Sequence, residues 1–548
     1  MNLEKQTPIG KQIPPIWFKI LVIFLIGLGI FFRFAHLDQK AIWYDEVFTS
    51  LAISGHTVAE VRQEVFNASV IPVTVLDKYQ HINPDRGVND TVRYLMTSDP
   101  QHPPLYYAML RLWAQVFGDS PVGLRSLSAA ISLLVFPSVY WLCVELFESP
   151  IVGWMAIALI AVSPLQIFLA QDARQYGLWM VTILVSSAAL LRAIRRETLA
   201  SWAIYAITLA LGLYTHLFTA LIAIAHGIYV IFRQRFRFNK SLVNYLLGTL
   251  FGVLIFLPWL FVVITHISTA QQLTSWLSSI KMDNPFDLIA IFLTRLSRIF
   301  FDVNLASDNS FDNKFILESH NIYYSIISLI FAFNLILYLG YFLAKECTKS
   351  ISLFLVLLGG IPALCLLLPD LIWGGIRSIT FRYQLPLYIS IQIAVAYILA
   401  FHILFEKHWR QKIWQFLMVG VLIIGLVSDV MFFKADTWWT QAGNQSLQTT
   451  AKYINKFENI LLVTNDNVLN IGVFLYFSHV LEPKINLLTI QSEHLPSLAQ
   501  EFSNILLWDY NLTHSQELVA RFKEDKTYSV SLIDPVSELW RIEKLENK

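Results

Sequence analysis

The sequence predicts an all-α polytopic membrane protein with a small C-terminal α/β domain. Three observations support this prediction. The chain of 548 residues is 55% hydrophobic and only 14% charged, long apolar stretches recur up to residue 433, and the composition after that point becomes polar and mixed. The net charge of +1 gives no information about partners, so the distribution of charge matters more, and nucleic acid is not an expected partner. The three cysteines form neither a disulfide framework nor a metal-binding spacing.

Eleven apolar stretches are predicted to span the membrane, because a spanning helix needs about 20 apolar residues. They are residues 17–35, 122–146, 151–170, 174–194, 201–216, 217–233, 242–264, 321–344, 351–369, 384–405 and 413–433. The first of them lacks a small-residue cleavage site and is interpreted as an uncleaved span.

Two further apolar runs, 103–118 and 286–301, are short and carry charge on one face. In the first, Arg111 and Gln115 lie opposite Leu112 and other apolar residues. This pattern favours helices that lie in the membrane interface instead of crossing it.

Basic clusters in the loops give the orientation, since Lys and Arg are enriched in cytoplasmic loops. The clusters occur at 192–196, 233–240, 345–349 and 407–412. With eleven spans and a cytoplasmic N-terminus, all four face the cytoplasm. Loop 36–121, loop 265–320 and the C-terminal tail are then predicted to lie outside. The loop at 147–150 has no basic residue and gives this scheme the least support.

The tail is predicted to be a separate extracytoplasmic α/β domain, residues 434–548, following a transmembrane catalytic domain, residues 1–433. Residues 459–464, 504–510 and 528–534 are predicted strands, and residues 445–456, 466–479 and 514–524 are predicted helices. The tail is long enough for a small domain. It has no glycine-rich phosphate loop, so we expect a lid or recognition domain over the outer face.

Four polar motifs are predicted to lie outside at the level of the membrane surface. They are WYDE (43–46), DPQHPPLYY (99–107), AQDARQY (170–176) and RSITFRYQLP (377–386). In the first, Asp45 or Glu46 could be a general base at the boundary between water and bilayer, with the other carboxylate orienting the substrate. The alternative is that this pair only begins a helix, since carboxylates are common N-caps.

The other three motifs have structural alternatives as well. Pro103 and Pro104 could simply start a helix, with His102, Tyr106 and Tyr107 as interface anchors. Asp172 could cap the next span while Arg174 extends to the interface. Arg377 and Arg382 could be surface cations, but they lie in an otherwise apolar outer turn and oppose the positive-inside tendency. This favours an anion-binding function for them.

The order of these motifs resembles the GT-C membrane glycosyltransferases. The resemblance covers residues 17–405 and includes "HPPLYY", "GDSPVGLRSLSA", "SPLQIFLAQDARQYGL" and "RYQLPLY". Within that class, the chain is similar to the branch of protein mannosyltransferases, aminoarabinose transferases and rhizobial lipopolysaccharide glycosyltransferases. The tail resembles the family only in its predicted outer location.

The resemblance implies a transferase that moves a sugar from a polyprenyl-phosphate donor to a hydroxyl of a protein, lipid or glycan, usually with inversion. It also implies a multi-pass protein, here in a bacterial plasma membrane with the active site facing outward. The acidic pair in the first outer loop is the family's essential motif and corresponds to Asp45 and Glu46. Membrane lipids are expected partners as well.

The residues agree with this chemistry. Asp45 is the candidate base, and Arg382, with Arg377 and Arg174 as further candidates, would stabilise the charge on the leaving phosphate. The other candidate substrate-binding residues are His102, Tyr106, Tyr107, Asp172, Tyr176 and Tyr383. No leaving-group acid is required, in contrast to glycosidases with paired carboxylates. Some lipid-modifying relatives carry Lys in place of His102, which weakens the case that this side chain binds phosphate.

No cofactor is assigned from the sequence. Asp45, Glu46 and Asp172 could in principle bind a divalent metal, but there is no dedicated ligand set. The alternative from another class is a transporter or flippase of a lipid-linked saccharide. Transporters usually place ionisable residues near the bilayer midplane, and the predicted spans contain very few. No repeated half with matching broken helices is evident.

Overall fold

The computed structural model describes residues 10, 12–282, 284–303, 322–438, 442–465, 471–490, 501–509, 512–525, 527–535 and 537–545. The chain forms two compact units. The first, here called the membrane unit, comprises Met1–Asp38, Asp99–Tyr106 and Arg125–Trp439. The second, the α/β unit, comprises Gln39–Ser98, Tyr107–Leu124 and Thr440–Lys548.

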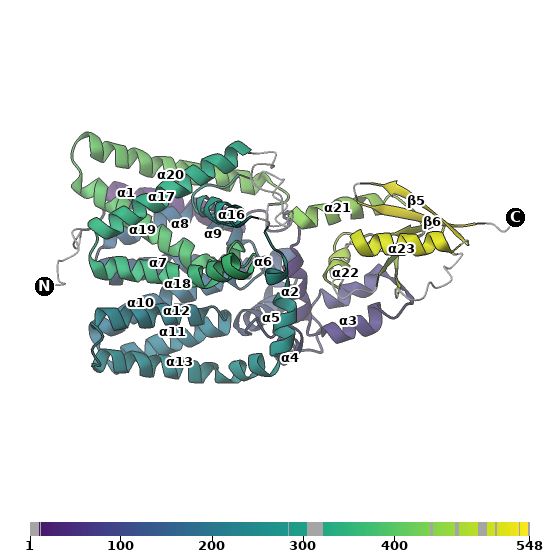
Figure 1. Ribbon diagram of the computed structural model, residues 1–548, viewed down its shortest axis with the longest axis horizontal. Coiled ribbons are helices and arrows are strands. Elements are labelled where there is room, and N and C mark those ends of the chain that lie inside the picture. The colour runs from purple at the N-terminus through teal and green to yellow at the C-terminus, as the bar shows by residue number, and fades with distance from the viewer. Residues whose placement is uncertain are drawn as a thin grey trace. The chain divides into compact units, whose positions relative to one another are not determined.

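The membrane unit is a bundle of helices that lie side by side (Figure 1). The helices are α1 (Ile16–Phe34), α7 (Val135–Phe147), α8 (Pro150–Ala161), α9 (Pro164–Ala170), α10 (Tyr176–Arg196), α11 (Leu199–Thr215), α12 (Thr219–Arg233), α13 (Lys240–Thr265), α14 (Ile267–Thr274), α15 (Trp276–Ser279), α16 (Pro285–Ser297), α17 (Ile322–Lys345), α18 (Lys349–Trp373), α19 (Leu385–Phe405) and α20 (Trp409–Lys434), with a 3-10 turn η3 (Phe381–Tyr383). The bundle also receives α6 (Pro121–Leu133), which runs into α7.

Each of the eleven predicted spans coincides with a helix or a helix pair. Among the described residues, eight helices are long and apolar enough to cross a membrane, and the bent pair α8 and α9 makes a ninth candidate. The remaining two, α11 and α12, are apolar but shorter, with 17 and 15 residues. Residues 304–320 of the predicted outer loop 265–320 lie outside the described residues.

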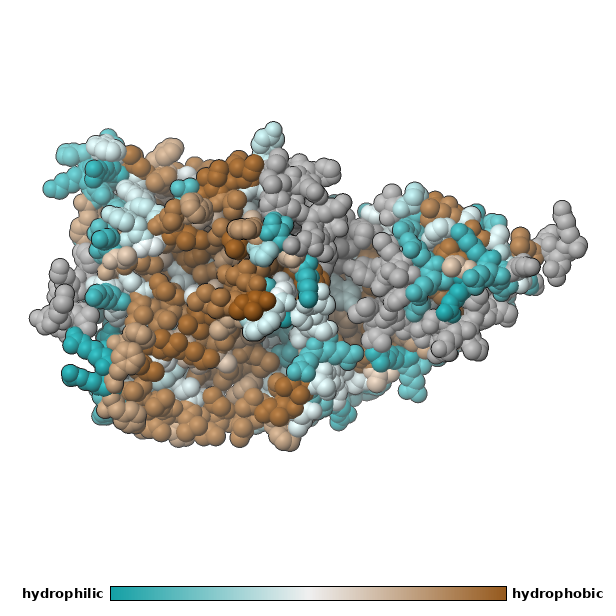
Figure 2. Space-filling view, in the orientation of Figure 1, coloured by the Kyte–Doolittle hydropathy of each residue, from teal (hydrophilic) through white to brown (hydrophobic). Residues whose placement is uncertain are grey.

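The apolar helices differ in how much of their surface is buried within the protein. The apolar window of α10 is 89% buried within the protein, whereas that of α17 is only 22% buried. The exposed apolar side chains cover the sides of the bundle, and hydrophilic residues gather at its left end in Figure 2. Glu145, the one carboxylate predicted inside the second span, forms ion pairs with Arg192 at 3.5 Å and Arg195 at 2.5 Å.

The break between α8 and α9 is stabilised by α1. The two helices are bent by 67° at Pro164, which has no N–H to donate to the carbonyl of Ile160. The guanidinium of Arg33 donates to this carbonyl at 3.2 Å and to that of Ala161 at 3.3 Å. In return, Gln171 after α9 donates to two backbone carbonyls at the end of α1. These reciprocal caps fix the start of the AQDARQY turn.

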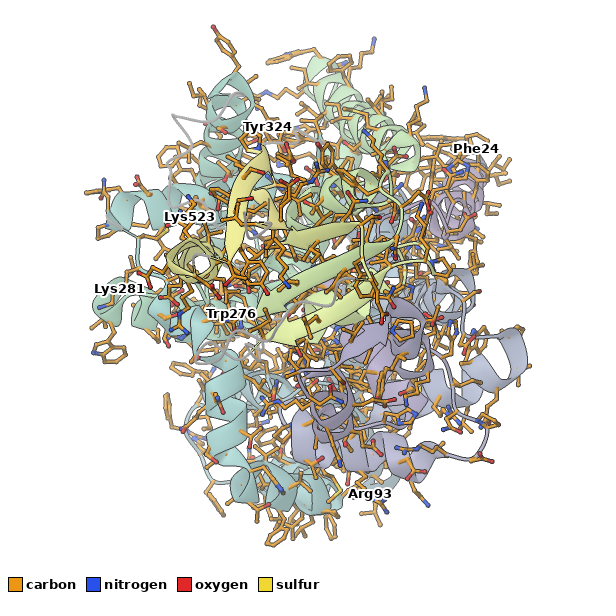
Figure 3. The ribbon with its side chains drawn as sticks, turned by 90° about the vertical axis from the view of Figure 1, so that its right-hand side faces the viewer. Phe24, Arg93, Trp276, Lys281, Tyr324 and Lys523 are labelled. Carbon is orange, nitrogen blue, oxygen red and sulfur yellow. The ribbon has the colours of Figure 1, made fainter. Side chains whose placement is uncertain are left out.

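The α/β unit contains one mixed sheet, which faces the viewer in Figure 3. Its elements are α2 (Tyr44–Ser54), α3 (Val58–Val65), β1 (Val70–Pro72), the 3-10 helix η1 (Val73–Tyr79), α4 (Val88–Ser98), α5 (Leu105–Phe117, which begins in the membrane unit), α21 (Ala442–Ile454), β2 (Ile460–Asn465), α22 (Ile471–Phe477), β3 (Asn486–Ile490), β4 (Asn504–Leu507), α23 (Leu512–Glu524), β5 (Tyr528–Asp534) and β6 (Leu539–Lys544). The strand order is β1-β3-β2-β4-β6-β5.

The three central strands are parallel, because β2 pairs with β3 on one side and with β4 on the other. All six residues of β2 are buried, as expected for a central strand covered on both faces. Apolar residues of β2, β3 and β4 pack with Leu518 and Phe522 of α23 to form the core. The predicted α/β fold and its three predicted strands are confirmed, whereas β1, β3 and β6 were not predicted. Residues 466–470 and 510 of two predicted elements lie outside the described residues.

The α/β unit is larger than the tail that was predicted to form it. Strand β1 comes from the first outer loop and pairs antiparallel with β3, with Val70 opposite Leu488. Residues 39–98 and 107–124 therefore belong to the same compact unit as the tail. The expected boundary at 433/434 marks only where the C-terminal part of this unit begins.

The two predicted amphipathic helices are present as α5 and α16. In α5, the polar face points into the protein: Arg111 is 1% exposed, and its guanidinium donates to the carbonyls of Ile53, Asn83 and Arg86. The opposite, apolar face is open, with Val116 76% exposed. This arrangement supports contact between the apolar face and the membrane interface.

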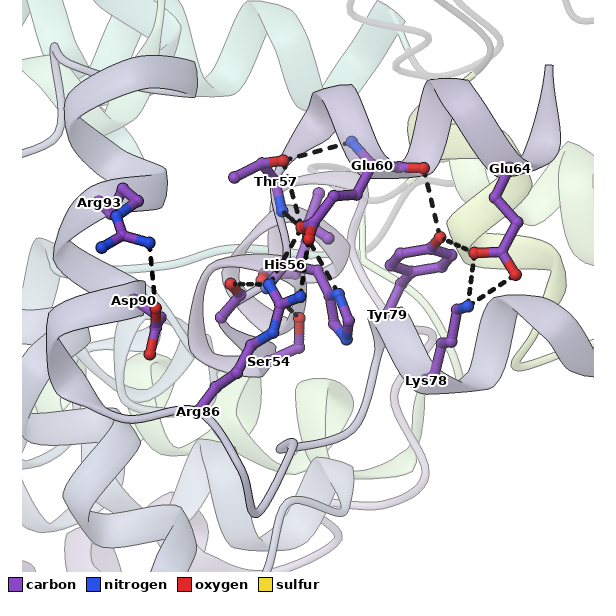
Figure 4. Close-up of polar contacts among 12 residues, drawn as sticks. Ser54, His56, Thr57, Glu60, Glu64, Lys78, Tyr79, Arg86, Asp90 and Arg93 are labelled. Carbon is purple, nitrogen blue, oxygen red and sulfur yellow. Dashed lines mark hydrogen bonds and ion pairs between the residues drawn. The ribbon is translucent and has the colours of Figure 1, made fainter. Parts of the chain in front are cut away.

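An ion-pair cluster joins α3 to the end of η1 and to the segment that follows it (Figure 4). The carboxylate of Glu60 accepts hydrogen bonds from the Thr57 backbone at 2.6 Å and from Arg86 at 2.7 and 3.0 Å. One turn later, Glu64 accepts from Lys78 and from the hydroxyl of Tyr79. Each carboxylate thus joins α3 to a residue between 78 and 86.

Candidate active site

The acidic pair lies in the first turn of α2, in the α/β unit. Glu46 is buried, and its Oε2 accepts a hydrogen bond of 2.9 Å from the backbone N–H of Trp43, the N-cap residue. Asp45 is only half-buried. Glu46 therefore has the helix-starting function that the sequence allowed for, and Asp45 is the more accessible carboxylate of the two.

In the membrane unit, Asp99, His102 and Arg174 form a hydrogen-bonded chain that joins two segments far apart in the sequence. Asp99 Oδ2 lies 2.8 Å from His102 Nδ1, and His102 Nε2 lies 3.2 Å from Arg174 Nη2. Because a guanidinium can only donate, His102 Nε2 must be the acceptor, and Nδ1 carries the proton that is donated to Asp99. Arg174 is 3% exposed, so this chain orients a buried cation.

Two guanidinium groups lie near the same aromatic ring, that of Tyr176. The Cζ atoms of Arg174 and Arg382 lie 6.0 and 5.9 Å from the ring centroid of Tyr176. Both cations also act electrostatically on His216, whose ring lies 6.1 Å from that of Tyr176. Two like charges repel each other in a site of low dielectric constant. A bound anion would offset this repulsion, so the arrangement suits an anionic ligand.

Aromatic rings surround Arg382 on further sides. Its Cζ lies 5.6 Å from the ring centroid of Tyr383 and 6.0 Å from that of Trp276, within the range of cation–π contacts. The ring of Tyr383 in turn packs edge-on against Phe218 at 5.2 Å. The side chain of Arg382 is therefore oriented by three rings of the membrane unit, those of Tyr176, Trp276 and Tyr383.

Arg377 has a different environment. Its Nη1 lies 2.7 Å from Oδ1 of the buried Asp370. The other oxygen of Asp370 accepts from the backbone N–H of Ser378 at 2.6 Å and from the hydroxyl at 2.7 Å. These contacts fold the turn between α18 and η3, which favours a structural function for Arg377.

The remaining predicted site residues are distributed over both units. Asp172 is buried in the turn before α10, and its carbonyl accepts from the backbone N–H of Arg174 at 2.8 Å. The hydroxyl of Tyr106 lies 2.8 Å from that of Ser128 in the membrane unit. Tyr107 is buried in the α/β unit.

Two residues of this region, His216 and Trp276, were not predicted. His216 ends α11 inside a predicted span, and Trp276 lies in an outer loop with no recognisable motif. The sequence signal that could have indicated a site residue here was His216 itself, a polar residue at the junction of the predicted spans 201–216 and 217–233. Within the ranges that the structure describes, no group of three or more His, Cys, Asp or Glu side chains could hold a metal ion.

Comparisons with known proteins agree with the fold. The family model for dolichyl-phosphate-mannose-protein mannosyltransferases matches residues 101–261. The apo structure of ArnT from Cupriavidus metallidurans has a TM-score of 0.50 and 11% identity, covering 96% of this chain and 98% of that one. The apo structure of the Archaeoglobus fulgidus oligosaccharyltransferase has a TM-score of 0.50 and 12% identity, covering 86% of this chain and 64% of that one.

This chain thus spans less than two thirds of the archaeal enzyme. No curated protein sequence gives a significant match. The resemblance to the GT-C membrane glycosyltransferases is confirmed. The chain is a multi-pass integral membrane protein with the fold of that class.

Proposed function

We propose that this protein transfers a sugar from a polyprenyl-phosphate donor to an acceptor hydroxyl at the outer face of a bacterial plasma membrane. The observation that carries the proposal is the pair of guanidinium groups, Arg174 and Arg382, at the ring of Tyr176. The family match to enzymes that use a dolichyl-phosphate-linked mannose supports the same class of donor.

The chemistry requires a stabilised phosphate. As the bond between the anomeric carbon and the phosphate oxygen breaks, negative charge grows on the leaving group. Preorganised cations in a site with little water stabilise that charge without reorganisation. Arg382 is the primary candidate, and Arg174, oriented by His102, is the second. Arg377 is bound to Asp370 and is assigned no direct contact with the donor.

The acceptor must lose a proton as its oxygen attacks the anomeric carbon. Asp45 is the proposed general base, and Glu46, which begins α2, is proposed to orient it. Attack from the side opposite the phosphate would invert the anomeric centre. Asp172, Tyr106, Tyr107, Tyr176 and Tyr383 are proposed to line the substrate site. Residues 1–433 are proposed to form the catalytic domain, in which the first outer loop supplies Asp45, and residues 434–548 are proposed to lie outside.

The test uses the purified protein in lipid vesicles with radiolabelled polyprenyl-phosphate mannose, the probe suggested by the family match. Envelope extract from a strain that lacks this protein serves as the acceptor. We expect label in a covalent product, and the Asp45→Asn protein should not form it. Movement of intact donor across the vesicle membrane without covalent product would instead indicate a flippase. Other polyprenyl-phosphate sugars, including aminoarabinose, are then compared to identify the donor.

A further inference from the structure

The residue before Asp45 is in very close contact with the C-terminal part of the chain. The ring of Tyr44 lies directly over Gly472 in α22, so that a Cβ atom at position 472 would come within 2.4 Å of two ring carbons. Real Cβ atoms do not approach other atoms so closely, and all residues of α22 are buried. Only glycine at this position lets the ring of Tyr44, the first residue of α2, stay in place.

A buried glutamine makes a second connection between the same two helices. Gln80 is 1% exposed, and its Oε1 lies 3.0 Å from Nε2 of His479, two residues after α22. Its amide nitrogen donates to the carbonyl of Val47 at 3.2 Å. Val47 lies in the first turn of α2, next to the acidic pair. Gln80 therefore connects the C-terminal segment to the backbone that carries Asp45 and Glu46.

Further hydrogen bonds join the first outer loop to the C-terminal segment. The backbone N–H of Val73 donates to the carbonyl of Ile485 at 3.0 Å. The hydroxyl of Thr489 donates to the carbonyl of Val65 at 3.1 Å, and β1 pairs with β3. The first outer loop and the C-terminal segment are thus joined along their length within one compact unit.

We propose that the C-terminal segment positions the catalytic base, with Gly472 and Gln80 as positioning residues that act through α2. This inference rests on the proposed function, in which Asp45 is that base. It assigns the tail a function in the chemical step, beyond the lid or recognition function predicted from the sequence.

The first test is Gly472→Ala. The added methyl group must displace the ring of Tyr44, and we expect this displacement to shift the start of α2. Alanine is a better helix former than glycine, so α22 itself should not be weakened. We expect a single-turnover rate at least tenfold lower, with unchanged affinity for polyprenyl-phosphate mannose. The control is Gly87→Ala in the same unit, where an added Cβ meets nothing within 4 Å, and it should keep the normal rate.

A comparison with Asp45→Asn separates positioning from a general structural effect. If Gly472 acts through the base, Gly472→Ala should lower the rate in the natural protein and have no further effect in Asp45→Asn. An equal loss in both backgrounds, or a normal rate for Gly472→Ala alone, would overturn the inference. If Gly472→Ala does not accumulate as folded protein, the same comparison is made with Gln80→Leu, for which we expect the same pattern.

The experiment also distinguishes this inference from the proposed function. A normal rate in Asp45→Asn would overturn the assignment of the base and the inference together. A strongly reduced rate in Asp45→Asn with normal rates in both positioning variants would overturn the inference alone.

Discussion

Arg174 and His102 are joined by a hydrogen bond of 3.2 Å, although 72 residues separate them in the sequence. The bond fixes the tautomer of His102, because its Nε2 must accept from the guanidinium while its Nδ1–H is donated to Asp99. A neutral histidine is therefore used to orient a buried cation, and it does not need to bind phosphate itself.

The first prediction concerns this hydrogen bond. His102→Leu removes the acceptor from a buried guanidinium, which should destabilise the protein by about 1.5–3 kcal/mol, the usual scale for a hydrogen bond to a charged group. His102→Gln offers a carbonyl oxygen and should recover part of the loss. Thermal unfolding of the two variants in the same detergent provides the comparison. Equal stability of the Leu and Gln variants would show that the bond does not hold Arg174.

The second prediction separates the two adjacent carboxylates. Asp45→Asn keeps the size of the side chain but removes its basicity, so transfer should fall by roughly 10²-fold or more. Glu46→Gln keeps an oxygen that can accept from the N–H of Trp43, and the start of α2 should survive. We expect a loss of less than tenfold for this variant. Single-turnover rates at saturating donor measure both, and the reverse order of the two losses would assign the base to Glu46.

The membrane helices were predictable because the information that forms them is local. A long apolar stretch must form a helix in a bilayer, whatever else the chain contains. The amphipathic pattern of α5 could also be recognised from its local sequence. The partners that bury its polar face come from other segments and could not be recognised in this way. The sequence placed Arg111 on the polar face of an interfacial helix, and the structure shows that this face is buried against carbonyls of Ile53, Asn83 and Arg86.

The set of segments that forms the α/β unit was not predictable from local sequence. Strand β1 has three residues and pairs with residues 486–488, more than four hundred positions away. So short a strand is stabilised by its partner and has no pattern of its own. Within the RSITFRYQLP motif, the sequence already favoured Arg382 over Arg377 but did not show what Arg377 binds. Asp370, at the end of α18, binds Arg377 and distinguishes the two.

The third prediction is a pH dependence from the ion pair in Figure 4. Hydrogen bonds from Arg86 and from the Thr57 backbone lower the pKa of Glu60 from 4.5 to about 2. A lowered folded-state pKa contributes stability that is complete above pH 4.5 and is lost as the pH falls towards 2. The side chain of Glu60 is 39% exposed, so solvent screening keeps this contribution small.

We therefore expect Arg86→Ala to lower the unfolding temperature at pH 6 and to lower it much less at pH 2.5, where the hydrogen bond from Arg86 to the carbonyl of Gly55 is still lost. Arg93→Ala is the matched control, because Arg93 is 71% exposed and its distance to Asp90 is 3.6 Å. It should have no effect at either pH. A deficit in Arg86→Ala that is the same at both pH values would show that its cause is packing and not the charge of Glu60.

The fourth prediction concerns orientation. A single cysteine at Arg93, in α4, should react with an impermeant thiol reagent added outside intact cells, in a background without the three native cysteines. A cysteine at Leu199, which is 87% exposed at the start of α11, should react only after the membrane is permeabilised, since it follows a basic cluster. Reaction of the second cysteine in intact cells would reverse the predicted orientation.

The last prediction concerns the donor phosphate. If Arg382 binds it, Arg382→Ala should weaken donor binding by about 1.5–3 kcal/mol for each charge-assisted hydrogen bond lost. The single-turnover rate should fall as well, because part of the interaction develops only with the charge of the leaving group. Arg382→Lys should recover part of both, since a point charge replaces a planar group with several donors.

Arg377→Ala is the matched control, five residues away in the same motif. Because Arg377 is bound to Asp370, its loss should lower the unfolding temperature but leave donor affinity nearly unchanged. Donor affinity is measured with polyprenyl-phosphate mannose in detergent, and all three variants are compared at equal concentrations of folded protein. Normal affinity and rate in Arg382→Ala would remove Arg382 from the site. Arg174, whose guanidinium also lies near the ring of Tyr176, would then be the phosphate ligand to test.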